Sequence, residues 1–351
     1  MQRRTFIRRA LLASSVWLLP ACRKGGRREA VLRNLVERVV VPNTFALARD
    51  SGRLEHEVTR LGVEPTLATL RTVRAHWQQA LVSWKRADVF RNGPIMDSNC
   101  LLRAMFWPVR SGAIEALVQG SQSLDEASID AMGVDRRGLF GLEYLLYGKA
   151  TEQESVAEFS GPTGERRARL ARALAGNVSL NAEHVVKALG NGHEFAVQFA
   201  HGGQDSLNHV VGQMIYAVES VSAKRLTRVA TLAKSGRLEA SEVEGSLSGT
   251  SQQIALAYLR ATEQLYRAAD DGLGQLVKAR SSTADQAIRS AFAQAISLVS
   301  NLAAPLEIVA RRDFAALEAA VDSVKNLERA LRTELVSSLG VSMTFSSVDG
   351  D

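Results

Sequence analysis

The sequence predicts an all-α protein built as two packed antiparallel helical bundles. Glycine-poor stretches with apolar residues at intervals of three and four alternate with Gly, Pro and Ser breaks, whereas alternating β-branched runs are almost absent. Short connections such as 310–312 favour antiparallel neighbours. The composition changes near 161–162 and between 190 and 203, so we expect bundles at approximately 29–190 and 204–351.

The helices with the clearest spacing are predicted, in chain order, over residues 29–41, 66–90, 136–147, 164–174, 182–189, 206–232, 252–271, 283–309 and 313–338. Pro305 should kink the eighth of these, because a proline inside a helix donates no backbone hydrogen bond. Asp313 can cap the last helix, whose apolar residues form one stripe: Phe314, Leu317, Val321, Val324, Leu327 and Leu331.

The first 22 residues predict a lipoprotein signal peptide. Basic residues come first, a mostly apolar stretch covers 10–21, and Cys22 follows the small residue Ala21 as in a bacterial lipobox. The stretch is shorter than the roughly 20 apolar residues that span a bilayer. We therefore expect acylation of Cys22 and attachment to a bacterial membrane by the lipid. The adjacent Arg3 and Arg4 resemble a twin-arginine export signal, although an ordinary basic region remains the alternative.

The positive charge of the chain is concentrated at its N-terminus. The formal net charge is +6, but the first 28 residues hold eight basic residues and no acidic one, which leaves 35 basic against 37 acidic side chains. Residues 23–28 are therefore expected to form a basic tether beside the lipid headgroups. A near-neutral body lacks the electrostatic footprint of a nucleic-acid-binding protein.

Cysteine and tryptophan are expected to serve packing. The only cysteines are Cys22 and Cys100, so no disulfide framework is expected, and Cys100 should be a small buried hydrophobe. Trp77 and Trp84 lie seven residues apart on one helical face, which favours a place in the core. The same role is expected for Trp107, although this residue could also border a cleft.

Four segments of the chain form a recognisable series. They are a tryptophan-bearing helix and Gly-Pro turn at 77–94, Trp107-Pro108 with a short helix at 114–117, the run 138–148, and the terminus from Leu339 to Asp349-Gly350-Asp351. In this order they resemble the imelysin-like family, also called the M75 peptidase family. Residues 244–251 are similar to that family's Glu- and Ser-bearing loop. The resemblance implies two packed helical bundles, export to the bacterial envelope, and an association with iron acquisition.

The run 138–148 lines up with the family signature Gly-x-His-x-x-Glu-[Tyr/Phe]-Leu-Leu-x-Gly. Histidine and glutamate three residues apart share a helix face and can bind one metal ion. Phe140 occupies the histidine position and has no lone pair to donate, so only Glu143 remains as a metal ligand. Glu143 could bind iron or another divalent ion with ligands from elsewhere. Alternatively, it accepts hydrogen bonds from a tyrosine, an arginine or a helix N-terminus in the bundle seam, because a buried carboxylate needs such partners.

Other candidate residues are less specific. His201, Asp205 and His209 are spaced like a row on one helix, but two glycines interrupt the row, and Asp205 reads more simply as a helix N-cap. Glu244, Ser248 and Trp107 could border a cleft between the bundles, although Glu244 and Ser248 could instead belong to a capped loop between two helices. Asp349 and Asp351 are either ligands folded back onto the body or an acidic end.

The sequence is compatible with three functions. The first is a non-catalytic binding or accessory lipoprotein for iron or metal uptake, with envelope transport proteins as partners. The second is an M75-type metallopeptidase with a site built from Glu143 and non-adjacent histidines, although no His-Glu-x-x-His motif is present. The third is a metal-free envelope protein that presents a helical cleft to another protein. Phe140, which replaces the histidine of the signature, favours this third function.

Overall fold

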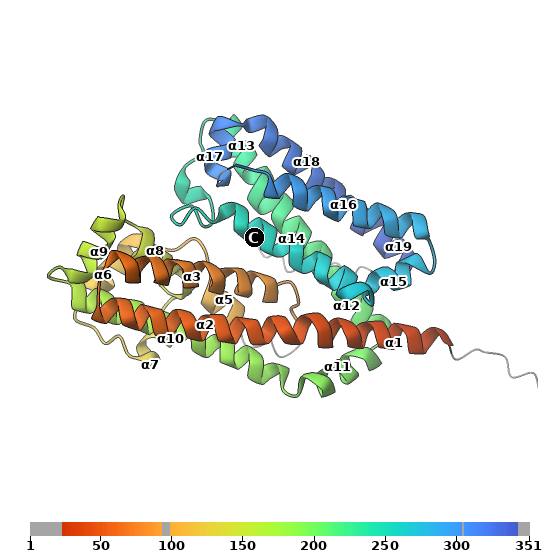
Figure 1. The fold of residues 1–351 in the computed structure, drawn as a ribbon, viewed down its shortest axis with the longest axis horizontal. Coiled ribbons are helices and arrows are strands. Elements are labelled where there is room, and N and C mark those ends of the chain that lie inside the picture. The colour runs from red at the N-terminus through yellow and green to blue at the C-terminus, as the bar shows by residue number, and fades with distance from the viewer. Residues whose placement is uncertain (1–22, 93–98, 304, 343–351) are drawn as a thin grey trace, which may run out of the picture.

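The computed structural model describes residues 23–92, 99–303 and 305–342. In these segments the chain is helical throughout and contains no strand, which confirms the predicted all-α class (Figure 1). None of the helices in this part of the chain combines the length and the apolar character needed to cross a membrane.

A long helical rod runs along the first group of helices. It consists of α1 (Arg23–Leu35), the π-helical segment η1 (Val36–Val40) and α2 (Val41–Val63), and the residues predicted as a basic tether begin α1. The predicted end of this helix at Val41 was wrong. Pro42 lies in the first turn of α2, and the π-helical turn before it accommodates a residue that donates no backbone hydrogen bond.

Two further long helices, α3 (Leu67–Ala87) and α10 (Gly164–Leu189), pack along α2. The prediction of two helices over 164–189 was wrong, because α10 continues through Gly176. Ala175, Val178 and Ala182 are buried around this glycine, so tertiary packing outweighs its low helix propensity. The shorter elements of this group are α5 (Cys100–Met105), α6 (Ser111–Gln119), α7 (Glu126–Asp130), η2 (Val134–Arg136), α8 (Gly138–Tyr147), α9 (Glu152–Ser160) and α11 (Gly192–His201).

The second group of helices forms the upper layer in Figure 1. Its long helices are α12 (Gln204–Glu219), α14 (Ser251–Arg267), α16 (Ser282–Ser300) and α18 (Phe314–Ala330), and α16 packs against both α14 and α18. The π-helical segment η3 (Ser220–Thr227) joins α12 to α13 (Arg228–Lys234) without a break. The remaining elements are η4 (Ala240–Glu242), η5 (Ala268–Asp270), α15 (Leu273–Lys278), α17 (Leu306–Arg312), η6 (Leu331–Leu335) and α19 (Val336–Leu339).

The ends of the last long helices test two predictions. The kink expected at Pro305 is instead a break, because α16 ends at Ser300 and Pro305 precedes the first residue of α17. The cap expected at Asp313 is confirmed, since its Oδ1 accepts a hydrogen bond from the Ala316 N–H at 3.1 Å. The predicted stripe, which runs along α18 and into η6, is buried except for Phe314, which is half-buried.

The two groups meet where α3 packs against α14, and again where α1 contacts α15. The loop between α13 and α14 extends from the second group toward α8 and α3 (Figure 1). This loop carries the segment 243–250, in which residues of the two groups come together.

Candidate functional site

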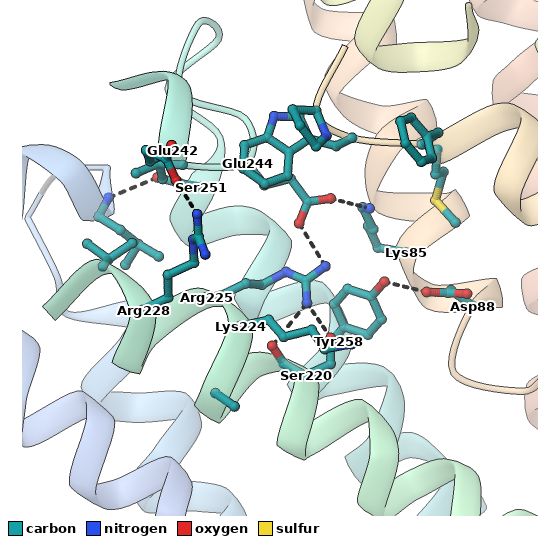
Figure 2. Close-up of a pocket in the computed structure, with 18 of the residues that line it drawn as sticks. Lys85, Asp88, Ser220, Lys224, Arg225, Arg228, Glu242, Glu244, Ser251 and Tyr258 are labelled. Atoms are coloured by element: carbon teal, nitrogen blue, oxygen red, sulfur yellow. Dashed lines mark hydrogen bonds and ion pairs between the residues drawn. The ribbon is translucent and has the colours of Figure 1, made fainter. Parts of the chain in front are cut away.

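A cavity of about 770 Å³ lies between the two groups of helices. One side consists of the C-terminal end of α3, α5 and residues 106–108, and the other of η3, α13 and residues 241–244, with the starts of α14 and α17 at its base. Of the described residues that line it, five are cationic and three are acidic. Figure 2 shows the polar centre of this cavity.

Glu244 lies at this centre between two cations (Figure 2). Its Oε1 is 2.6 Å from Lys85 Nζ, and its Oε2 is 2.7 Å from a guanidinium nitrogen of Arg225. The three side chains are largely buried, with exposed fractions of 11%, 3% and 12% respectively. Burial alone would raise the pKa of Glu244, but Arg225 and Lys85 outweigh it and lower this pKa to about 2. Glu244 is therefore a carboxylate at neutral pH.

The π-helical segment η3 fixes the position of Arg225. In a π-helix residues five apart are hydrogen-bonded neighbours, and Arg225 Nη1 donates to both the backbone oxygen and the Oγ of Ser220, at 3.1 and 2.5 Å. The guanidinium also lies 4.5 Å from the centre of the Tyr258 ring. The Tyr258 hydroxyl donates to Asp88, which Arg91 also binds at 2.6 Å.

Glu143 is brought to the site by a close contact between α8 and α5. Gly138, at the start of α8, has a φ of +72°, and a Cβ there would lie 2.6 Å from the backbone oxygen of Ala104. Only glycine permits this approach. Glu143 projects from the same helix and is buried, with 3% of its surface exposed.

The partner of Glu143 is Ser248 in the loop before α14. Glu143 Oε1 accepts hydrogen bonds from the Ser248 N–H at 3.0 Å and from its Oγ at 2.5 Å. The loop turns at Gly245, where φ is +77° and a Cβ would lie 2.5 Å from Thr250 Oγ1. Glu143 thus accepts hydrogen bonds in the seam between the groups, but from a loop serine rather than from the tyrosine, arginine or helix N-terminus expected of such a carboxylate.

Burial governs the protonation of Glu143. Desolvation raises its pKa to about 7, against the opposing effect of the two hydrogen bonds from Ser248, and the nearby carboxylates Glu244 and Glu307 raise it further. The pKa of Glu307 is itself raised by burial. In this seam Glu244 is held ionised by cations, whereas burial keeps the pKa of Glu143 at about 7.

The metal site that the resemblance implies does not fit these residues. Phe140 packs edge-on against Trp77, with ring centres 6.5 Å apart, and the Lys85 ammonium lies 5.1 Å from the Phe140 ring centre. Both oxygens of Glu244 already bind cations. A divalent ion would have to lie beside two fixed positive charges and a carboxyl group whose pKa is raised by burial. In the part of the chain that the structure describes, no group of three or more His, Cys, Asp or Glu side chains could hold a metal.

The predicted cleft residues are divided between two places. Glu244 and Trp107 line the cavity, whereas Ser248 holds Glu143 beside it. Trp107 is only half-buried, but Trp77, Trp84 and Cys100 are buried as predicted.

The His201–Asp205–His209 row does not form. His201 ends α11 and is exposed, whereas His209 lies in α12 and contacts the backbone oxygen of Arg91. The prediction of Asp205 as an N-cap was wrong, because Gly203 occupies that position and Asp205 lies in the first turn. Cys22, Asp349 and Asp351 lie outside the described residues.

Two residues at the centre of the site, Lys85 and Arg225, were missed by the sequence analysis. A signal was present, because each is a charged residue on an apolar helix face: Lys85 lies four residues after Leu81 and eight after Trp77, and Arg225 lies four residues after Val221. A lone charge on such a face rarely stays buried without a partner.

Comparisons with known proteins agree with the family resemblance of the sequence motifs. The family model of imelysin, peptidase family M75, matches residues 41–339. Among solved structures, an iron-regulated protein A precursor from Parabacteroides distasonis is similar at a TM-score of 0.77 and 14% identity, covering 91% of this chain and 97% of that one. An imelysin-like protein from Psychrobacter arcticum is similar at a TM-score of 0.76 and 18% identity, with coverage of 92% and 98%. No curated protein matches the chain.

Proposed function

Because the chain belongs to the imelysin family, as its sequence motifs predict, we propose that it is a non-catalytic binding protein of the bacterial envelope. Its binding site is the cavity around Glu244. The family match covers the long helices of both groups and the loop that carries Glu244 and Ser248.

The observation that carries this proposal is the pairing of Glu244 with Lys85 and Arg225. In a metallohydrolase the carboxylates bind a metal or a water molecule, and an open coordination position faces the substrate. Here Glu244 is held by two ion pairs, and Glu143 is held by two hydrogen bonds from Ser248. The lysine ammonium supplies the positive charge that a metal ion would otherwise supply between these groups.

A place in iron acquisition is part of the proposal. One structural neighbour is named an iron-regulated protein, and regulation by iron does not require a protein to bind iron. We infer an accessory role, in which the protein is attached to the membrane through a lipid on Cys22 and acts with other envelope proteins. The lipobox-like sequence before Cys22 supports the anchor.

Elemental analysis of the natively exported protein tests the binding site. We expect substoichiometric iron and zinc, and no calorimetric heat on adding ferrous, ferric or zinc ions, because the carboxylates are already bound to cations. The matched variant Glu143→Gln should behave identically. Retention of about one equivalent of metal by the wild type, and its loss in Glu143→Gln, would instead establish a metal site and overturn the non-metal proposal.

Cys22→Ser is expected to release the protein from the membrane fraction. A serine at this position cannot form the thioether to which the lipid is attached, and a lipid anchor holds a protein only through its buried chains. Fractionation of the host cells, followed by immunoblotting, measures the distribution. Equal amounts of wild type and variant in the membrane pellet would show that Cys22 carries no anchor.

A further inference from the structure

The two sides of the cavity differ in chemistry. The side formed by α5 and the following turn is apolar and includes Leu102, Phe106 and Trp107. The opposite side, formed by η3 and α13, carries Lys224, Arg225 and Arg228 (Figure 2). Leu102 exposes 50% of its surface on the apolar side, which is more than a core leucine would expose. A ligand in the cavity therefore contacts an apolar surface and a cationic surface together.

The carboxylates of the cavity do not neutralise all of its cations. Glu244 is shared by Lys85 and Arg225, Asp88 binds Arg91, and Glu242 binds Arg228. Lys224 forms no ion pair with a carboxylate anywhere in the described segments of the chain. The cavity thus keeps an excess of positive charge, part of it partly shielded from water, where its attraction for an anion is stronger than at an open surface.

The ring of Tyr216 contacts two of the cationic side chains that line the cavity. The residue exposes 43% of its surface, and both Arg91 and Lys224 lie against its ring, with Cζ at 5.7 Å and Nζ at 5.5 Å from the ring centre. The ring attracts each cation, and Arg91 is also paired with Asp88. An anion could therefore bind at Lys224, and an attached apolar group could contact the ring.

From these features we propose that the cavity binds a small organic anion, in which a carboxylate or phosphate group is attached to an aromatic or aliphatic group. The anionic group lies at Lys224, and the apolar group lies against Tyr216, Leu102 and Trp107. The volume of about 770 Å³ falls within the range of small-molecule sites. This inference rests on the proposed function and adds the chemical class of the ligand.

Fluorescence of anilinonaphthalene sulfonate, an aromatic anion, tests the inference on the full mature chain. We expect saturable binding, energy transfer from Trp107, and displacement by phenylbutyrate. The neutral phenylbutyramide and inorganic phosphate should displace the probe poorly, because each offers only one of the two required groups. Equal displacement by the neutral amide would overturn the role of the cations, and equal displacement by phosphate would overturn the role of the apolar side.

Charge reversal locates the site. Lys224→Glu should weaken probe binding about tenfold, because it replaces an attraction with a repulsion at close range. Leu102→Ser should weaken it by about threefold through lost apolar contact. The matched control Lys278→Glu makes the same change in net charge at an exposed position on α15 and should leave the dissociation constant within about twofold. Equal effects of Lys224→Glu and Lys278→Glu would overturn the proposed site.

The outcomes separate this inference from the proposed function. A protein that holds no metal but does not bind the probe in a Lys224-dependent manner refutes the ligand class and leaves the binding protein intact. A protein that retains metal lost in Glu143→Gln refutes the proposed function, whatever the probe does. Thermal unfolding of each variant shows whether a change in probe binding reflects the site or a loss of fold.

Discussion

Glu244→Gln is expected to lower the free energy of unfolding by about 3–5 kcal/mol, because it leaves Lys85 and Arg225 as buried charges without their counter-ion. The glutamine keeps the shape of the side chain and can still accept a hydrogen bond. The loss therefore reports the missing charge rather than a cavity. Urea denaturation followed by circular dichroism at neutral pH measures the difference.

Two comparisons make this result specific. Glu318→Gln removes the partner of Lys234, whose ion pair lies at the surface, and should cost less than about 1 kcal/mol. The double variant Lys85→Met with Glu244→Gln should recover part of the loss, because one of the two orphaned charges is gone. If Glu244→Gln cost no more than Glu318→Gln, the buried ion pair would contribute little to stability.

The pKa of Glu244 also sets the sign of a pH effect. Its folded pKa of about 2 is below the ordinary value of 4.5, so the ionised carboxylate stabilises the folded state. This contribution is complete above pH 4.5 and is lost as the pH falls toward 2. Glu244→Gln should therefore differ most from the wild type at neutral pH and least in acid.

Glu143→Gln is expected to have the opposite pH dependence. The folded pKa of Glu143, about 7, is above its ordinary value of 4.5, so the folded state holds a proton that the unfolded state has released. The wild type should lose about 2–3 kcal/mol of stability between pH 5 and pH 8 from this group, and the uncharged glutamine should not. Glu143→Gln should then match the wild type near pH 5 and exceed it at pH 8.

Urea denaturation at pH 5, 6.5 and 8 measures this prediction. The glutamine oxygen can accept both hydrogen bonds from Ser248, which keeps the loop in place. As a control, Glu239→Gln neutralises an exposed carboxylate and should change the unfolding free energy by less than about 0.5 kcal/mol at each pH. A stability gap between wild type and Glu143→Gln that stays constant with pH would contradict the raised pKa.

The fold was predicted well where one physical signal dominates. The stripe of α18 and the cap at Asp313 could be read directly, because helical period and capping chemistry are local. The helix breaks expected at Pro42 and around Gly176 did not occur, since a π-helical turn and tertiary packing overrode local propensity.

The site could be predicted only in part. The family motifs drew attention to Glu143, Glu244 and Ser248, and the structure places these three around one seam. The pairing of Glu244 with Lys85 could not be read, because the two residues lie 159 positions apart and no local pattern links them. Phe140 indicated that a ligand was missing but could not indicate that a lysine ammonium lies over its ring.

Because η3 is π-helical, the cationic side of the cavity depends on the number of residues in the segment 220–227. The hydrogen bonds of η3 span one more residue than those of an α-helix, and each residue rotates the helix face by about 100°. Removing a single residue from 220–227 would restore ordinary α-helical pairing and turn either Arg225 away from Glu244 or Arg228, at the start of α13, away from Glu242. In an alignment of relatives, a one-residue deletion within 220–227 would therefore identify proteins that have lost the cationic side of the cavity, even where every other motif is kept.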